Sequence, residues 1–175
     1  QSINCTYLLL PHKVGVEMRK VPIILLVHNE YRFLDLCIKS IERRTNTNFE
    51  ILIVDNRSNN PMAKNFLSQI EGKFKKFYNK KNNWVNGFNL ALAYIERNAE
   101  SYTEYYVLSD CDVIVPIPKA GVCWLTSLMK LMDRNPFVGK LGLALDYSLL
   151  PKKPELTDAL DKERKYMRGP TVNND

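Results

Sequence analysis

Apolar runs of strand length alternate along this chain with segments in which apolar residues recur at helical spacing, and this alternation restricts the possible folds most. Strands are expected at residues 21–27, 49–54, 75–78, 104–109 and 138–145, and helices at 31–44, from Asn60-Pro61 onward, at 85–98 and at 125–132. Repeated strand–helix–strand units favour an open, mostly parallel sheet with helices on both faces. The sequence therefore predicts an α/β fold.

The sequence divides into three parts by its patterning. Residues 1–20 form an N-terminal extension, residues 21–150 hold the alternating elements, and residues 151–175 are charged, with fading apolar periodicity. The chain begins with Gln1 rather than Met, so we expect a fragment of a longer protein. Its 175 residues, 45% of them hydrophobic, suit one globular domain with an adequate core.

Cysteine usage and hydropathy indicate a cytoplasmic protein. The four cysteines are widely spaced and form no CxxC pair, which argues against a disulfide framework or a zinc site and favours a reducing compartment. No apolar run approaches the roughly 18 residues of a membrane span.

A lysine cluster contributes to the formal net charge of +6. Such an excess favours anionic partners: nucleotides, nucleic acid or an acidic membrane surface. A solvated basic face explains the cluster equally simply, so charge alone does not assign a function. Its members are Lys73, Lys75, Lys76, Lys80 and Lys81.

Polar side chains follow three of the expected strands at the point where each strand ends. His28 to Glu30 follow the first strand, Asp55 to Ser58 the second, and Asp110 and Asp112 the fourth, in the stretch YYVLSDCDV. In an open α/β sheet, ligands gather beyond the carboxyl ends of the strands. We therefore expect these three clusters to form one site.

Asp110 and Asp112 are two carboxylates with one residue between them. In an extended segment such a pair points to the same side, and the cost of burying ionised carboxylates predicts an exposed strand end. Oxygen ligands suit Mg²⁺ or Mn²⁺ better than zinc. The alternative is that these aspartates only cap a turn.

Four sequence blocks, in this order and spacing, resemble the nucleotide-sugar-binding half of a family-2-like glycosyltransferase of the GT-A (Rossmann-like) fold. They are VPIILLVHNEYRFLDLCIKSI, FEILIVDNRSNN, NNWVNGFNLALAY and YYVLSDCDVIVP, and the resemblance extends over about residues 21–124. The resemblance implies an inverting, metal-dependent transfer of a sugar from a nucleoside diphosphate sugar, expected to be a UDP-sugar, to a saccharide or lipid-linked acceptor. It also implies polysaccharide biosynthesis, peripheral association with the inner face of the membrane, and no nucleic-acid partner.

The resemblance also implies roles for individual residues. Asp55 would contact the nucleobase with Asn56 beside it, and Gly87, which lacks a side chain, would let a helix start approach the nucleotide closely. Asp110 would lie near the ribose or the metal, and Asp112 would be the principal metal ligand. The base and ribose pocket would be lined by Val27, His28, Asn29 and Glu30.

Some residues depart from the family pattern. His28 stands where an aromatic residue is usual, Arg57 where a small residue is common, and Leu92-Ala93 where Arg-Asn is frequent. No carboxylate after the two aspartates sits in a convincing motif for a catalytic base, so residues 151–175 are expected to belong to an incomplete acceptor region. The candidates for the base are Asp146 and Asp175, together with Asp158, Asp161 and Glu163.

Two other functions remain open from the residues alone. A nucleotidyltransferase also joins an α/β sheet to metal-binding aspartates, but the segment HNEYRF lacks the glycine of its phosphate loop. A single-stranded nucleic-acid-binding module would combine the lysine cluster with exposed rings for base stacking. The rings available for it are Phe74, Phe77, Tyr78 and Trp84.

Overall fold

A computed structural model describes residues 19–144, 146, 157 and 161. The chain separates into two compact units, residues 1–117 and residues 118–175. All three polar clusters predicted from the strand ends belong to the first unit. The three-part division expected from composition stays a prediction.

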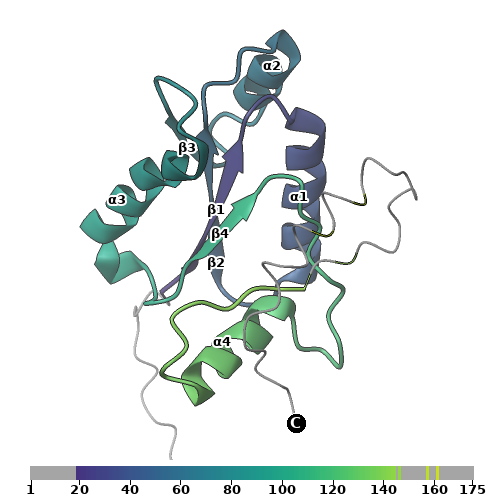
Figure 1. Cartoon of the computed structure of the whole chain (residues 1–175), viewed down its shortest axis with the longest axis vertical. Helices are drawn as coiled ribbons and strands as arrows, with labels where there is room; N and C mark the ends of the chain where they lie inside the picture. The colour runs from purple at the N-terminus through teal and green to yellow at the C-terminus, as the bar shows by residue number, and fades with distance from the viewer. Residues whose placement is uncertain (1–18, 145, 147–156, 158–160, 162–175) are drawn as a thin grey trace, which may run out of the picture. The chain divides into compact units, whose positions relative to one another are not determined.

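The first unit is an α/β fold with a parallel sheet (Figure 1). Its described strands pair in the order β3-β2-β1-β4, and all three pairings are parallel. Helices α1 and α3 lie on opposite sides of the sheet in Figure 1, which confirms the predicted architecture. The elements in chain order are β1 (Val21–Val27), α1 (Tyr31–Arg44), β2 (Phe49–Asp55), α2 (Pro61–Gln69), β3 (Lys75–Tyr78), the 3₁₀ helix η1 (Trp84–Phe88), α3 (Asn89–Arg97), the 3₁₀ helix η2 (Ala99–Ser101) and β4 (Val107–Asp110).

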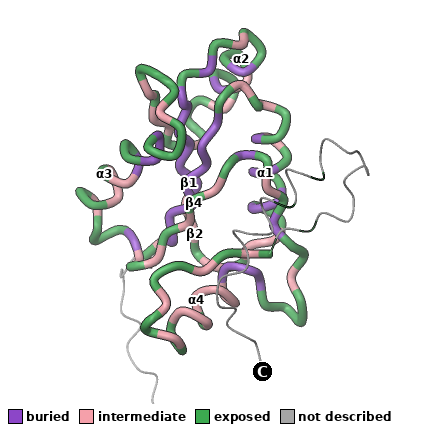
Figure 2. The backbone as a smooth tube through the Cα atoms, viewed as in Figure 1, coloured by how far each residue is buried: buried purple, intermediate pink, exposed green. Residues whose placement is uncertain are grey.

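The core lies along the two central strands, β1 and β2, which Figure 2 shows as almost continuously buried. Every residue of β1 is buried, as expected for a strand covered on both faces. One side of the sheet packs against η1 and α3, because Phe88 and Ala91 belong to the same buried cluster as Ile24 and Leu26 of β1. The buried side chains of α1 include Leu34 and Ile41. The sheet is therefore covered by helices on both of its faces.

Strand register brings the carboxyl ends of the strands to one edge. Val27 pairs with Asp55, Leu26 with Asp110, and Asp55 with Tyr78 on the outer strand. Because the strands are parallel, the loops that follow β1, β2 and β4 all leave the sheet at this edge. The chain therefore carries its polar strand ends to a common place.

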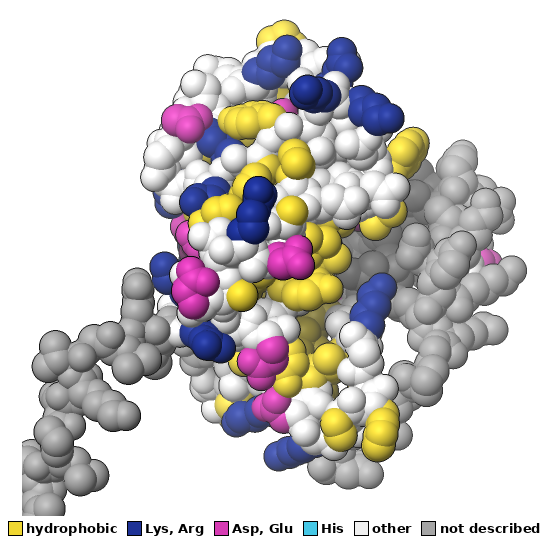
Figure 3. Space-filling model, turned by 90° about the vertical axis from the view of Figure 1, so that its left-hand side faces the viewer, with side chains coloured by type: hydrophobic (Ala, Val, Ile, Leu, Met, Phe, Trp, Pro, Cys, Tyr) yellow, Lys and Arg dark blue, Asp and Glu magenta, His cyan; other side chains and the backbone are white. Residues whose placement is uncertain are grey.

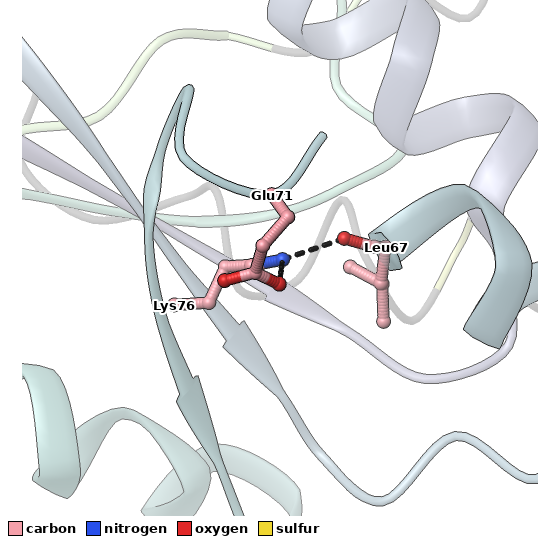
Figure 4. Close-up of polar contacts among 3 residues, drawn as sticks. All are labelled: Leu67, Glu71 and Lys76. Atoms are coloured by element: carbon pink, nitrogen blue, oxygen red, sulfur yellow. Dashed lines mark hydrogen bonds and ion pairs between the residues drawn. The ribbon is translucent and has the colours of Figure 1, made fainter. Parts of the chain in front are cut away.

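Lys76 joins β3 to the end of α2 (Figure 4). Its Nζ donates a hydrogen bond to the Leu67 carbonyl at 2.6 Å and forms an ion pair with Glu71. The Lys76 side chain is only 3% exposed, whereas that of Glu71 is 72% exposed. A cation at the last carbonyls of a helix is favourable because those carbonyls have no partner within the helix.

Three expected elements differ in the structure. The helix expected at 85–98 begins as the 3₁₀ helix η1 and becomes α-helical only at Asn89. Strand β4 starts at Val107, after a bend at Glu104, rather than at residue 104. The strand expected at 138–145 was wrong: residues 138–144 form no strand, and Gly139 and Gly142 in this segment weaken strand formation.

Within the second unit, helix α4 (Trp124–Arg134) confirms the helical spacing of leucine and methionine predicted there. Asn135 ends the helix, with its Nδ2 donating to the Leu131 carbonyl at 2.8 Å. Proline follows directly, as is common after a helix. Among the residues that the structure describes, no helix is both long enough and apolar enough to cross a membrane.

Candidate functional site

Asn29 ties the loop after β1 to the loop after β2. Its Oδ1 accepts hydrogen bonds from the backbone N–H groups of Asn59 at 2.8 Å and Asn60 at 2.9 Å, and its own backbone N–H donates to Ser58 Oγ at 2.8 Å. The residue has a positive φ of 67°, a conformation that asparagine tolerates better than most residues. The structure thus gives Asn29 a loop-binding role, while its predicted nucleotide contact stays a prediction.

His28 presents an exposed ring at the same edge. Its Nδ1 lies 3.0 Å from the Asn56 carbonyl, and because a carbonyl can only accept, Nδ1 must carry the proton. Val27 is buried, and its carbonyl accepts from the Asn56 backbone N–H at 2.8 Å. Glu30 is exposed at the start of α1. The predicted pocket residues therefore lie together, with the His28 ring held in one orientation.

Asp55, the last residue of β2, is a buried carboxylate with an assigned partner. It is 7% exposed, and its Oδ1 accepts from the backbone N–H of Ser58 at 2.8 Å. Its backbone carbonyl accepts from the Asn79 N–H at 2.9 Å, which extends the contact to the loop after β3. The hydrogen bond from Ser58 fixes the direction in which the carboxyl group points.

The Asn56 side chain is a hub that sequence reasoning missed. It is 2% exposed, and its Nδ2 donates to Asn82 Oδ1 at 2.8 Å and to the Trp84 carbonyl at 3.3 Å. Its Oδ1 accepts from Asn79 Nδ2 at 3.1 Å and from the Asn83 backbone N–H at 3.0 Å. These four bonds use the full capacity of an amide. The side chain that was predicted to lie beside the nucleobase therefore holds the loop after β3.

Gly87 makes room for this hub. A Cβ at residue 87 would lie 2.8 Å from Leu26 Cδ1 and 3.0 Å from Asn56 Oδ1. The close approach expected from the missing side chain thus exists, but in the structure it is made to Leu26 and Asn56. The nucleotide contact of Gly87 stays a prediction.

Asp110 and Asp112 stand on either side of a buried cysteine. Asp110 ends β4, Asp112 lies in the turn that follows, and both are exposed. Cys111 between them is buried, with its Sγ 3.9 Å from the Glu30 carbonyl. Because Cys111 is turned inward, the two flanking carboxylates reach solvent, as the i, i+2 spacing predicts. Both carboxylates are exposed, and Asp112 lies within the turn, so the alternative that these aspartates only cap a turn stays open.

The segment after the aspartates is bound to α1. The Val115 backbone N–H donates to Ser40 Oγ at 3.2 Å, and Arg44 Nη1 donates to the Val115 carbonyl at 2.6 Å. Both Ser40 and Val115 are buried. These contacts fix the exit of the turn, so that the two aspartates project from a defined backbone.

The charges at this turn repel each other. Partial burial and the nearby charge of Asp112 raise the pKa of Asp110 above its ordinary value of 3.8. Burial, followed by the charge of Asp112, raises the pKa of the Cys111 thiol to about 12, so this thiol stays neutral. Over the described ranges, neither aspartate takes part in an ion pair, and no group of three or more His, Cys, Asp or Glu gathers as a metal site. The chain thus offers two carboxylates, a donor set that fits a Mg²⁺-type cation completed by water or phosphate oxygens.

The lysine cluster is largely engaged within the protein. Lys73 pairs with Glu42 at 2.9 Å, Lys75 donates to Tyr94 Oη at 2.7 Å, and the ammonium of Lys76 is buried. In Figure 3, Lys and Arg side chains lie among acidic and apolar ones on the face shown. Of the rings proposed for base stacking, Phe77 packs against the core. Three of the five lysines are therefore engaged within the protein, whereas Lys80, Lys81 and the rings of Tyr78 and Trp84 are exposed.

The structure describes two of the carboxylates considered as a catalytic base. Asp146 and Asp161 are both exposed and belong to the second unit. The others, Asp158, Glu163 and Asp175, lie outside the described residues. The role of the base stays a prediction.

Comparison with known protein families places most of the chain in one family model. The family model described as glycosyl transferase family 2 matches residues 23–154, which is most of the chain. No curated protein matches the chain. The matched span contains all three polar clusters at the carboxyl edge of the sheet.

Proposed function

The chain belongs to glycosyl transferase family 2, and from this premise we propose that it transfers a sugar from a UDP-sugar to an acceptor hydroxyl with the help of Mn²⁺ or Mg²⁺. The observation that carries the proposal is the pair of exposed carboxylates, Asp110 and Asp112, at the edge where Asp55 and His28 also lie. Membership in the family supports a nucleotide-sugar donor in general. The base, the metal and the stereochemistry are our proposals.

The nucleoside end of the donor belongs at the loops after β1 and β2. Asp55 has one oxygen fixed by Ser58, so the second oxygen can accept from a nucleobase N–H. The exposed His28 ring has its orientation fixed by Asn56 and can stack on the base. The Asp55 carboxylate would favour a base with a ring N–H, which uracil and guanine have and cytosine and adenine lack in the nucleoside.

The diphosphate belongs at the turn that carries Asp110 and Asp112. These two side chains would hold the cation, and a bound divalent cation there supplies positive charge against the diphosphate oxygens. Charge stabilisation of a leaving group is often the largest single contribution to catalysis. The mutual repulsion of the two carboxylates favours such a cation at this turn.

In the proposed inverting reaction, the acceptor oxygen attacks the anomeric carbon of the sugar. The new C–O bond forms as the bond from that carbon to the diphosphate oxygen breaks, and a carboxylate takes the acceptor proton. Asp146 and Asp175 remain the first candidates for this base. We propose a saccharide or lipid-linked acceptor in polysaccharide biosynthesis.

We also propose a cytoplasmic location at the inner face of the membrane. Within the described residues, Cys37 and Cys111 take part in no disulfide, which suits a reducing compartment. The net charge of +6 suits attraction to an acidic membrane surface. A vesicle-binding assay with and without anionic lipid tests this placement.

Isothermal titration with UDP, GDP, CDP and ADP, each with and without Mn²⁺, tests the donor proposal. UDP should bind most tightly, and its binding should weaken when the metal is removed by a chelator. Equal affinity for all four nucleotides would overturn the choice of base, and metal-independent binding would overturn the role of Asp110 and Asp112. The anomeric configuration of the product, read by NMR, tests inversion.

A further inference from the structure

His28 and Trp84 both have exposed rings, and both residues are hydrogen-bonded to the same buried residue, Asn56. His28 donates to the backbone carbonyl of Asn56, and the side-chain amide of Asn56 donates to the carbonyl of Trp84. Asn56 directly follows Asp55, the carboxylate that we propose binds the nucleobase. The Trp84 side of this arrangement has no role in the proposed function so far.

The backbone of Trp84 is held in a conformation that tryptophan avoids. Its φ is +50°, in the left-handed region where most residues with a Cβ are disfavoured. The Trp84 N–H donates to Asn82 Oδ1 at 3.0 Å, and its carbonyl accepts from Asn56 Nδ2 at 3.3 Å. The loop therefore holds this residue at both of its backbone polar groups.

The Trp84 indole ring is mostly exposed and therefore gains little free energy from burial. Trp84 is 78% exposed, although tryptophan is the side chain with most apolar surface to bury. Residues kept in sparsely populated backbone conformations cluster at ligand-binding sites, where the surrounding structure maintains them. A strained backbone that displays an exposed indole is therefore better explained by a ligand than by folding.

We propose that Trp84 is a stacking wall of the nucleobase site, with its indole against one face of the donor's base. This inference rests on the proposed nucleotide-sugar function and adds to it the residue that supplies affinity for the base. A planar base is the expected occupant because Asn56, the residue next to Asp55, is hydrogen-bonded both to the exposed His28 ring and to the backbone of Trp84. Stacking of a base on an aromatic ring is also tolerant of base identity, so Trp84 supplies affinity while Asp55 supplies selectivity.

Calorimetry with two ligands separates stacking from other roles. Trp84→Ala should weaken UDP binding about tenfold, which is the size of one base–aromatic stack, while pyrophosphate with Mn²⁺ should bind as in the wild type. Trp84→Phe should retain most of the UDP affinity. Tyr106→Ala is the matched control, because Tyr106 is an exposed ring of the same unit, located before the amino end of β4.

Fluorescence gives a second, direct readout. The chain has two tryptophans, Trp84 and Trp124, so the emission that wild type has and Trp84→Phe lacks reports on Trp84. UDP should quench this emission at saturation, and pyrophosphate with Mn²⁺ should leave it unchanged. Circular dichroism of Trp84→Ala should match the wild type because the indole buries little surface.

The outcomes distinguish this inference from the proposed function. Wild-type protein that binds no nucleoside diphosphate would overturn both. Wild-type binding of UDP together with unchanged affinity in Trp84→Ala would overturn the stacking wall alone. So would an equal loss of UDP and pyrophosphate affinity.

Discussion

Two parts of the same sheet edge are built in opposite ways. At the asparagine junction, which we define as Asn56, Asn79, Asn82 and Asn83, the side-chain amide of Asn56 makes all four of its possible hydrogen bonds within the protein. At the aspartate turn, residues 110–112, two carboxylates face solvent outside every ion pair of the described ranges. One region is complete in itself, and the other carries unbalanced charge.

The comparison distinguishes a region that is already ordered in the free protein from a region that is stabilised by binding a ligand. A saturated buried amide network stabilises the fold and fixes the loops before any ligand arrives. A pair of like charges does the reverse: it costs stability in the free protein and is repaid only when a cation binds. Changes in the junction should therefore alter stability and binding together, whereas changes in the turn should separate the two.

The largest expected effect is loss of turnover in Asp112→Ala. Without this carboxylate the turn has one ligand left, and we expect glycosyl transfer to fall about a thousandfold, as when a main charge-stabilising group is removed. The melting temperature should not fall, because Asp112 is exposed, lies outside the ion pairs of the described residues and repels Asp110. Steady-state kinetics and thermal unfolding measure the two quantities.

Asp35→Ala is the control for that experiment. Asp35 is a surface carboxylate paired with Lys39 on α1, and such pairs contribute little to stability. Both turnover and melting temperature should be preserved. Normal turnover in Asp112→Ala would show that the turn has no catalytic part.

Asn56→Asp should damage the junction. The carboxylate keeps the acceptor role but replaces the N–H₂ group, so it faces Asn82 Oδ1 and the Trp84 carbonyl without a proton to share. We expect a loss of about 2–3 kcal/mol in the free energy of unfolding, the cost of leaving buried polar groups unpaired, and weaker UDP binding. Denaturant unfolding and calorimetry report the two effects.

Asn59→Asp makes the same chemical change where only an acceptor is used. Asn59 is exposed, and its Oδ1 accepts from Asn29 Nδ2 at 3.0 Å. An aspartate can accept that bond equally well, so stability should change little. Equal losses in the two variants would mean that added charge, rather than the missing donor, weakens the protein.

The sequence predicts features whose cause is local. The apolar run of β1, the helical spacing of α1 and the Asn60 cap before Pro61 each depend on neighbouring residues, and all three are confirmed. The position of Asp110 and Asp112 after a strand predicted that they would be exposed at the carboxyl edge, because the carboxyl ends of parallel strands lie at one edge of the sheet.

Features that depend on distant contacts were not predictable. The region expected to begin a helix at residue 85 starts as the 3₁₀ helix η1, and the preceding loop is held by Asn56, which lies 28 residues before Trp84. The left-handed backbone of Trp84 lies in the same loop. No local pattern reports such a contact. The only available signal was the repetition of asparagine at residues 79, 82 and 83.

Gly87→Ala tests how tightly the junction is packed. Alanine normally favours a helix over glycine by about 1 kcal/mol, but here its Cβ would lie 2.8 Å from Leu26 Cδ1 and 3.0 Å from Asn56 Oδ1. Both neighbours are buried, so we expect a net loss of about 1–2 kcal/mol from overpacking. Chemical denaturation measures it, and Gly72→Ala, at a residue with no atom within 4 Å of the added Cβ but a φ of +79°, shows the cost of backbone strain alone.

The smallest expected effect is a gain in stability from Asp110→Asn in metal-free buffer. The pKa of Asp110 is raised in the folded protein, so its charged form is less favourable there than in the unfolded chain. Removing the charge should therefore stabilise the protein at neutral pH, by at most about 0.5 kcal/mol because both carboxylates are exposed. The gain should vanish as the pH falls below the ordinary aspartate pKa, where the wild-type carboxyl is protonated in both states. Mn²⁺ should reverse the ranking, since it stabilises the wild type and not the variant. A destabilised Asp110→Asn variant in metal-free buffer would mean that this carboxylate already has a favourable partner, and the contrast with the asparagine junction would then fail.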